Sequence, residues 1–173
     1  CSYRWGFRER AVPGGYKQVA VPIFKNKTQE AGIEADFTNA LIRQFERSQV
    51  AHIASKDVAP VRIDGLIETL VVSGGTGGLQ GGSANNPLPT DAVLRTEYQV
   101  FVSTRIQVRR QSDEKIIWEG SFRDQMNYQA PRIGEPVVNS ANATYNQSLR
   151  HHVVSQLAEE MMSDAHDRIT ENF

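Results

Sequence analysis

The chain has 173 residues, of which 39% are hydrophobic and 23% are charged, and its formal net charge is −1. These values are typical of one globular domain with a real core. The balanced charge argues against nucleic acid as a partner, because binding phosphates needs a basic face. No apolar run approaches the roughly 18 residues of a membrane-spanning helix.

The only cysteine is residue 1, in the opening stretch "CSYRWGF". Cys1 could mark an engineered boundary, act as a free nucleophilic thiol, or be the lipidated first residue of a mature bacterial lipoprotein. No His or acidic residue is patterned nearby to activate a thiol. We favour the lipoprotein, since a sole cysteine at position 1 would otherwise be a coincidence. Ser2 agrees with delivery to the outer membrane, because an Asp there commonly retains enterobacterial lipoproteins in the inner membrane.

Residues 1–15 are predicted to be a lipidated lead that ends in the turn "PGG", and residues 16–173 a single α/β domain. The first strand is expected in "YKQVAVPIF", residues 16–24, where Val19, Val21 and Ile23 alternate with other residues. Pro22 has no amide to donate, so this strand lies at an edge or ends there.

A helix is predicted over residues 31–47, where apolar residues recur every four positions. The stripe consists of Ile33, Phe37, Leu41 and Phe45, and Glu34 lies in its first turn.

Two strands follow, a short one over residues 50–55 and a longer one over residues 59–72. One face of the longer strand is expected to carry Val61, Ile63, Gly65, Ile67, Thr69 and Val71. The other face carries Arg62, Asp64 and Glu68.

Residues 73–92 hold six of the thirteen glycines and are predicted to be a long loop within the domain. The glycine patterns of dinucleotide and phosphate-binding loops are absent, and no helix follows.

A β-hairpin is expected next, with strands over residues 94–110 and 115–128 joined by the turn "QSDE". On the first strand, Tyr98, Val100, Val102, Thr104, Ile106 and Val108 share one face. Arg105 and Arg109 lie on the other face. On the second strand, Ile116, Trp118, Gly120 and Phe122 share a face.

A long apolar stripe from Tyr145 to Ile169 predicts a final helix over about residues 139–170. The predicted fold is α+β, a two-layer sandwich. Two helices pack on one face of a mostly antiparallel or mixed sheet of four strands.

No catalytic or metal-binding set is found in the sequence. His151 and His152 are adjacent and point about 100° apart on a helix, and His166 has no companion at ligand spacing. No nucleophile elbow is present. We therefore predict a binding module without enzymatic activity, metal or cofactor.

The chain resembles the LptE family of lipopolysaccharide-assembly lipoproteins from Gram-negative bacteria. The resemblance rests on "CSYRWGF", "VAVPIFKNKTQEAGIEADFTNALIRQFERS", "RIDGLI", "RTEYQVFVSTRIQV" and "KIIWEGSFRD", in the family's order, and on Glu135 ahead of the final helix. These stretches cover most of the chain, and the second is the most specific.

The resemblance implies a protein triacylated at Cys1, on the inner leaflet of the outer membrane, whose domain plugs the lumen of the LptD β-barrel. Such proteins help the barrel assemble and help insert lipopolysaccharide into the outer leaflet. They are not enzymes.

Basic residues near the strand ends are implicated in lipopolysaccharide binding in this family. Arg132 matches one of them, whereas Asp91 stands at the aligned place of the other, with Arg95 a few residues on. The candidates for lipopolysaccharide binding are Arg132, Arg95, Arg105 and Arg109, since guanidinium groups suit phosphates.

Aromatic residues expected to be exposed, Phe101 and Tyr128, are candidates for contacts with the barrel. The alternative function is that of an outer-membrane lipoprotein adaptor that activates a cell-wall synthase. Copurification with a β-barrel or with a penicillin-binding enzyme separates the two.

Overall fold

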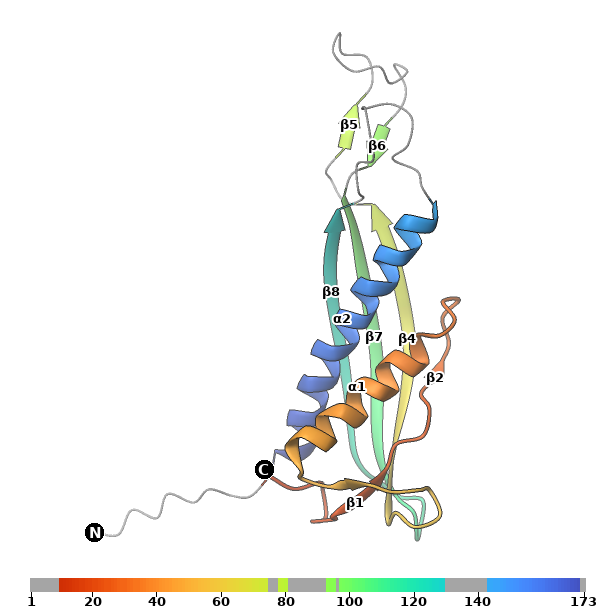
Figure 1. Ribbon diagram of the computed structural model, residues 1–173. Coiled ribbons are helices and arrows are strands. Elements are labelled where there is room, and N and C mark those ends of the chain that lie inside the picture. The colour runs from red at the N-terminus through yellow and green to blue at the C-terminus, as the bar shows by residue number, and fades with distance from the viewer. Residues whose placement is uncertain (1–9, 75–77, 81–92, 96, 130–142, 172–173) are drawn as a thin grey trace, which may run out of the picture.

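The computed structural model describes residues 10–74, 78–80, 93–95, 97–129 and 143–171 (Figure 1). It has two layers: two helices lie side by side on one face of an elongated, twisted sheet (Figure 1). The α+β sandwich predicted from the sequence is therefore confirmed. The number of strands is wrong, since the main sheet has six strands rather than four.

Three long antiparallel strands form the body of the sheet. They are β4 (Val61–Gly74), β7 (Glu97–Arg110) and β8 (Ile116–Gln129), each of 14 residues. Three short strands extend the sheet beyond β4, giving the order β3-β1-β4-β7-β8 with β2 also on β4. They are β1 (Gln18–Ala20), β2 (Lys25–Asn26) and β3 (His52–Ile53), and all of their pairings are parallel.

The strand expected over residues 16–24 is broken at Pro22. Ala20 pairs with Arg62 and Lys25 pairs with Leu66. The segment from Ala20 to Lys25 is therefore one residue longer than the segment of β4 that it faces. Pro22 lacks an amide to join the ladder, and the extra residue makes the chain bow away from β4. The predicted end of pairing at the proline is thus observed, with a second short strand after it.

Helix α1 (Ile33–Ser48) follows the prediction closely. All four residues of its apolar stripe are fully buried: Ile33, Phe37, Leu41 and Phe45. Gly32 precedes the helix with φ of 94°, a conformation that glycine adopts without steric cost. The Glu34 carboxylate accepts a hydrogen bond from the Gly32 amide (3.1 Å) and so helps to start the helix.

Helix α2 (Ala143–Thr170) runs along the sheet over β7 and β8 and packs beside α1 (Figure 1). Its buried face contains Val153, Val154, Leu157, Ala158, Met161, Met162, Ala165 and Ile169. The predicted four-residue stripe is confirmed from Val153 onward, and its first residue, Tyr145, has no described side chain. Arg43 of α1 forms an ion pair with Glu159 of α2. Arg150 of α2 forms another with Glu30, which precedes α1.

The face assignment of β4 is correct as far as Ile67 and wrong beyond it. A β-bulge shifts the register between Ile67 and Thr69, so the following side chains change faces. Val71 is 48% exposed, whereas Leu70 and Val72 pack against the core.

Two further short strands lie in and after the glycine-rich segment. β4 continues to Gly74, and β5 (Gly78–Gln80) pairs with β6 (Val93–Arg95) in a separate antiparallel ribbon. This ribbon extends beyond the upper end of the main sheet (Figure 1). The predicted loop 73–92 therefore contains regular structure at its start.

Candidate functional site

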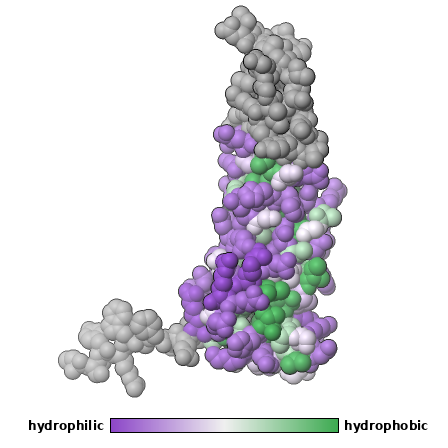
Figure 2. Space-filling view, in the orientation of Figure 1, coloured by the Kyte–Doolittle hydropathy of each residue, from purple (hydrophilic) through white to green (hydrophobic). Residues whose placement is uncertain are grey.

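The sheet has one apolar and one polar face. Its apolar face lies under α1 and α2, and the helices themselves present a mostly hydrophilic outer surface, with a small apolar area low on the side of β1 (Figure 2). Its open face carries the alternate, polar residues of β4 and β7, including Arg62, Asp64, Arg105 and Arg109. The alternation that the sequence predicted for these residues is confirmed.

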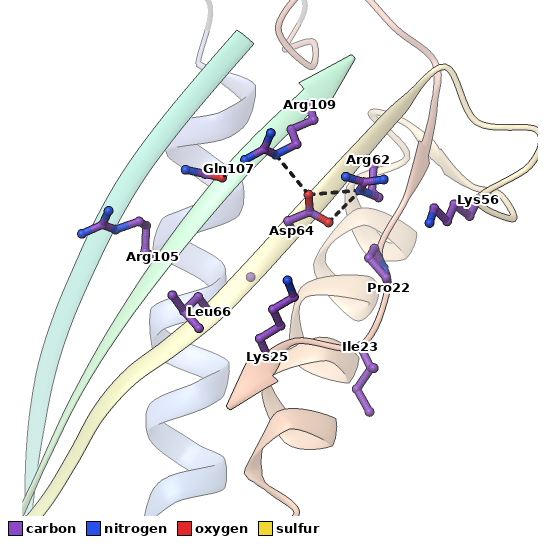
Figure 3. A pocket seen from close by; sticks show the side chains of 11 residues that line it. Pro22, Ile23, Lys25, Lys56, Arg62, Asp64, Leu66, Arg105, Gln107 and Arg109 are labelled. Atoms are coloured by element: carbon purple, nitrogen blue, oxygen red, sulfur yellow. Dashed lines mark hydrogen bonds and ion pairs between the residues drawn. The ribbon is translucent and has the colours of Figure 1, made fainter. Parts of the chain in front are cut away.

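A groove of about 510 Å³ lies on this open face, where the chain around Pro22 bows away from β4 (Figure 3). Phe24, which is 2% exposed, anchors the bow from the other side. Its amide donates a hydrogen bond to the Thr38 hydroxyl of α1 (2.9 Å), and its ring lies against Gly65. A side chain at position 65 would occupy the same space, so the glycine allows this close approach.

Two rows of side chains form the floor of the groove. The register pairs Arg62 with Arg109, Asp64 with Gln107, and Leu66 with Arg105. Pro22, Ile23 and Lys25 form one wall, and Lys56 reaches in from the segment after β3 (Figure 3). The lining includes five cationic side chains and one acidic one, in a chain whose net charge is −1.

Asp64 is the centre of an ion-pair cluster. Arg62 Nε donates to both of its carboxylate oxygens (2.8 and 3.0 Å), and Arg109 Nε lies 3.4 Å from Oδ2. The hydrogen bonds with Asp64 raise the pKa of Arg62 above its usual range, against the opposing effect of burial. Arg62 also pairs with Glu114 (3.1 Å).

Arg105 is turned toward the neighbouring strands. Its guanidinium lies 3.1 Å from Glu68 and 3.7 Å from Glu119, and in Figure 3 it points out of the groove. Lys25, by contrast, points along the groove toward Asp64 (Figure 3). Within the residues that the structure describes, neither Lys25 nor Lys56 has an ion-pair partner. The two lysines therefore hold the uncompensated charge of the groove.

The structure brings together two of the predicted basic residues. Arg105 and Arg109 both line the groove. Arg95 ends β6, and its side chain lies outside the described set. Arg132 and Cys1 are outside the described residues altogether.

The two predicted aromatic contacts are less exposed than expected. Phe101 is half-buried on β7, and Tyr128 packs against the hydrophobic core. The Tyr128 ring stacks on Tyr98 at 5.4 Å, and burial raises its pKa. Neither aromatic side chain is fully exposed as expected: both are partly buried, and Tyr128 packs on the core side of the sheet.

The histidines make no metal site within the described part of the chain, where no group of three metal-binding side chains is found. His166 is 3% exposed, packs edge-on against Phe45 and lies 2.8 Å from the Ser48 hydroxyl. None of the described helices is both long and apolar enough to cross a membrane.

Lys25 and Lys56 were not predicted from the sequence to be parts of a site. Arg62 and Asp64 were assigned to the correct face but not to a cluster, because the strand partner of β4 was unknown. The available signal was Pro22, which predicted a break in pairing beside a strand with alternating charges.

These features define a two-layer α+β binding domain with a cationic groove on its open sheet. The sequence model of the LptE family, described as lipopolysaccharide assembly, matches residues 16–172. The chain belongs to the lipopolysaccharide-assembly family LptE. This places it in outer-membrane lipopolysaccharide assembly and is consistent with the prediction of a non-enzymatic protein.

Solved structures with the same fold share little sequence with this chain. A PelC dodecamer structure from Paraburkholderia phytofirmans has 12% identity, covers 96% of this chain and 97% of its own, and gives a TM-score of 0.53. The structure of a minor lipoprotein from Acinetobacter baumannii has 9% sequence identity to this chain. The match covers 90% of this chain and 91% of the lipoprotein, with a TM-score of 0.51. A search of curated proteins found no match. At such identities the likeness supports the fold alone.

Proposed function

We propose that this chain is the lipoprotein subunit of an outer-membrane lipopolysaccharide translocon. In this proposal Cys1 carries the lipid anchor in the inner leaflet, and the domain plugs the lumen of an LptD-type β-barrel. It helps the barrel to assemble and assists lipopolysaccharide insertion into the outer leaflet. The observation that carries the proposal is the family match over residues 16–172, which spans both layers of the fold.

The open face of the sheet supports a position inside a barrel. The lumen of a large barrel is polar and wet, so a plug needs a polar surface that tolerates water. Ion pairs centred on Asp64 and Arg105 give the open face such a surface. Phe101 and Tyr128 remain proposed barrel contacts, through the edges that their partial burial leaves accessible.

Lipopolysaccharide binding is proposed for Arg132, Arg95, Arg105 and Arg109, with the first two as the main contacts. Arg95 precedes β7, whereas Arg105 lies eight residues along it, about 26 Å from its first residue. Arg95 is therefore apart from Arg105 and Arg109. Carboxylates already compensate Arg105 and Arg109, which favours the end of the sheet near Arg95 for a phosphate-bearing lipid.

Copurification from native outer membranes tests the main proposal. The full-length precursor, tagged at its C-terminus, is expected to recover a large β-barrel that mass spectrometry identifies. Recovery of a cell-wall synthase without a barrel would instead support the adaptor function and refute the plug.

Substitution of Arg132 tests the lipopolysaccharide step. We expect Arg132→Glu to weaken lipopolysaccharide binding in a pull-down with purified lipopolysaccharide, because the substitution replaces an attractive charge by a repulsive one. Arg123→Glu, at an exposed position of β8, is the matched control for net charge. Equal binding by the two variants, with unchanged circular dichroism, would remove Arg132 from the site.

A further inference from the structure

The groove beside Pro22 shares Arg105 and Arg109 with the proposed lipopolysaccharide contacts, but it also holds two cations that the lipopolysaccharide step does not use. The groove lies toward the end of β7 that is farther from Arg95. Its two uncompensated cations, Lys25 and Lys56, lie outside β6 and β7, the strands that carry Arg95, Arg105 and Arg109. We propose that this groove is a docking site for an extended acidic polypeptide segment of a partner protein. This inference is independent of the translocon proposal.

The charge balance of the groove selects an anionic partner. Among the described residues that line the groove, Asp64 is the only acidic one, and five of the others are cationic. Arg62 and Arg109 share Asp64, and Arg105 is held by Glu68 and Glu119, whereas Lys25 and Lys56 have no ion pair among the described residues. Carboxylates that reach the two lysines would complete the charge balance.

The floor of the groove fits a chain in the extended conformation. Its side chains alternate along β4 and β7, so neighbouring positions in each row are about 7 Å apart. An extended peptide repeats its side chains at the same interval. Carboxylates at alternate positions can therefore face the cations, while an apolar side chain lies against Ile23, which is 66% exposed, and Leu66.

The dimensions and lining argue against two other anions. A volume of about 510 Å³ is in the range of sites for whole ligands and is several times larger than a phosphate ion requires. The arginines that would grip a phosphate in bidentate fashion are already paired with carboxylates. Acyl chains need an apolar cavity, whereas the described lining combines three apolar side chains, Pro22, Ile23 and Leu66, with five cationic ones.

A binding assay with a defined peptide tests the proposal. The probe is a fluorescein-labelled octapeptide in which Glu alternates with Val or Pro, and fluorescence anisotropy measures its affinity for the full chain. We expect binding that weakens as salt rises. The double variant Lys25→Glu/Lys56→Glu should weaken binding at least about tenfold, since both attractive charges become repulsive.

A matched double variant separates the groove from the net charge. Lys17→Glu/Lys27→Glu reverses two exposed lysines outside the groove and should leave the affinity within about twofold of the original. Ile23→Ser should weaken binding without changing its salt dependence, because it removes apolar contact only. Circular dichroism and urea midpoints establish that each variant is folded.

Other outcomes would overturn the proposal. These are no binding of the octapeptide, equal loss in the two double variants, or equal binding of a peptide with Gln in place of Glu. Binding of inorganic phosphate or phosphatidylglycerol vesicles that depends on Lys25 and Lys56, without binding of the peptide, would assign the groove to another anion. The copurification experiment does not enter this test, so the two proposals can fail separately.

Discussion

Asp64 organises the open face because one carboxylate serves two arginines on neighbouring strands. Arg62 takes both oxygens and Arg109 approaches one of them. These side chains are partly exposed, so their value for stability is small and is screened by salt. Their main effect is to fix where the guanidinium groups point, which leaves Lys25, without an ion pair among the described residues, directed into the groove.

His166 is the buried ionisable residue with the clearest consequence for stability. Its ring lies between Phe45 and the Ser48 hydroxyl, 3.5 Å from Asp167. Burial lowers the pKa of His166 below its usual value of 6.5, and the opposing effect of Asp167 is smaller. The histidine is therefore neutral in the folded protein at pH 7.

A pH dependence of stability follows from this burial. Below about pH 6.5 the unfolded chain binds a proton at His166 more readily than the folded one, so the free energy of unfolding falls as the pH falls. Urea denaturation at pH 7.5 and pH 5.0 measures the change. His166→Gln should reduce the loss between these values, whereas the exposed control His152→Gln should not. An unchanged loss in His166→Gln would contradict this account.

At the scale of elements, β4 determines the shape of both faces. Its bulge after Ile67 moves Val71 outward, and its Gly65 accepts the ring of Phe24. The bulge changes which side chains of β4 reach the core. The contact between Phe24 and Gly65 holds the segment after Pro22 against the edge of the sheet. The groove is the space that remains on the other face.

Substitution of Gly65 should destabilise this arrangement. A Cβ at Gly65→Ala would overlap the Phe24 ring, so we expect a loss of about 1–3 kcal/mol in the free energy of unfolding, measured by urea denaturation. The Phe24→Leu background should reduce the cost of Gly65→Ala, because the smaller side chain leaves room. Additive effects of the two substitutions would show that Phe24 is not the obstacle.

At the scale of the whole molecule, periodicity in the sequence predicted most of the fold. The stripe of α1, the alternation of β7 and the early faces of β4 all follow from residues that repeat with the period of their element. β3 lies within the short strand predicted over residues 50–55, whereas β2 and β5 were not predicted as separate elements, because two or three residues carry no measurable period. The bulge was not predicted either, since nothing at Glu68 distinguishes it from its neighbours.

The groove could be predicted only in part, because its residues come from distant segments. Arg105 and Arg109 were identified from their shared face, but Lys25 and Lys56 join them only through the parallel pairings of β1, β2 and β3. Parallel neighbours leave no turn signature in a sequence. The pairing that creates the groove is therefore visible only in three dimensions.

The segment that begins at Arg10 is bonded to the last turn of α2. Arg10 forms an ion pair with Asp167 (2.7 Å), the Ala11 amide donates to the Thr170 carbonyl (3.2 Å), and Val12 is fully buried. A pulling force applied ahead of residue 10 would thus load the last turn of α2 before it reached β1. Because α2 packs along β7 and β8, the force would pass from the helix to these strands of the sheet. Tension at this end would therefore act on both layers of the fold together.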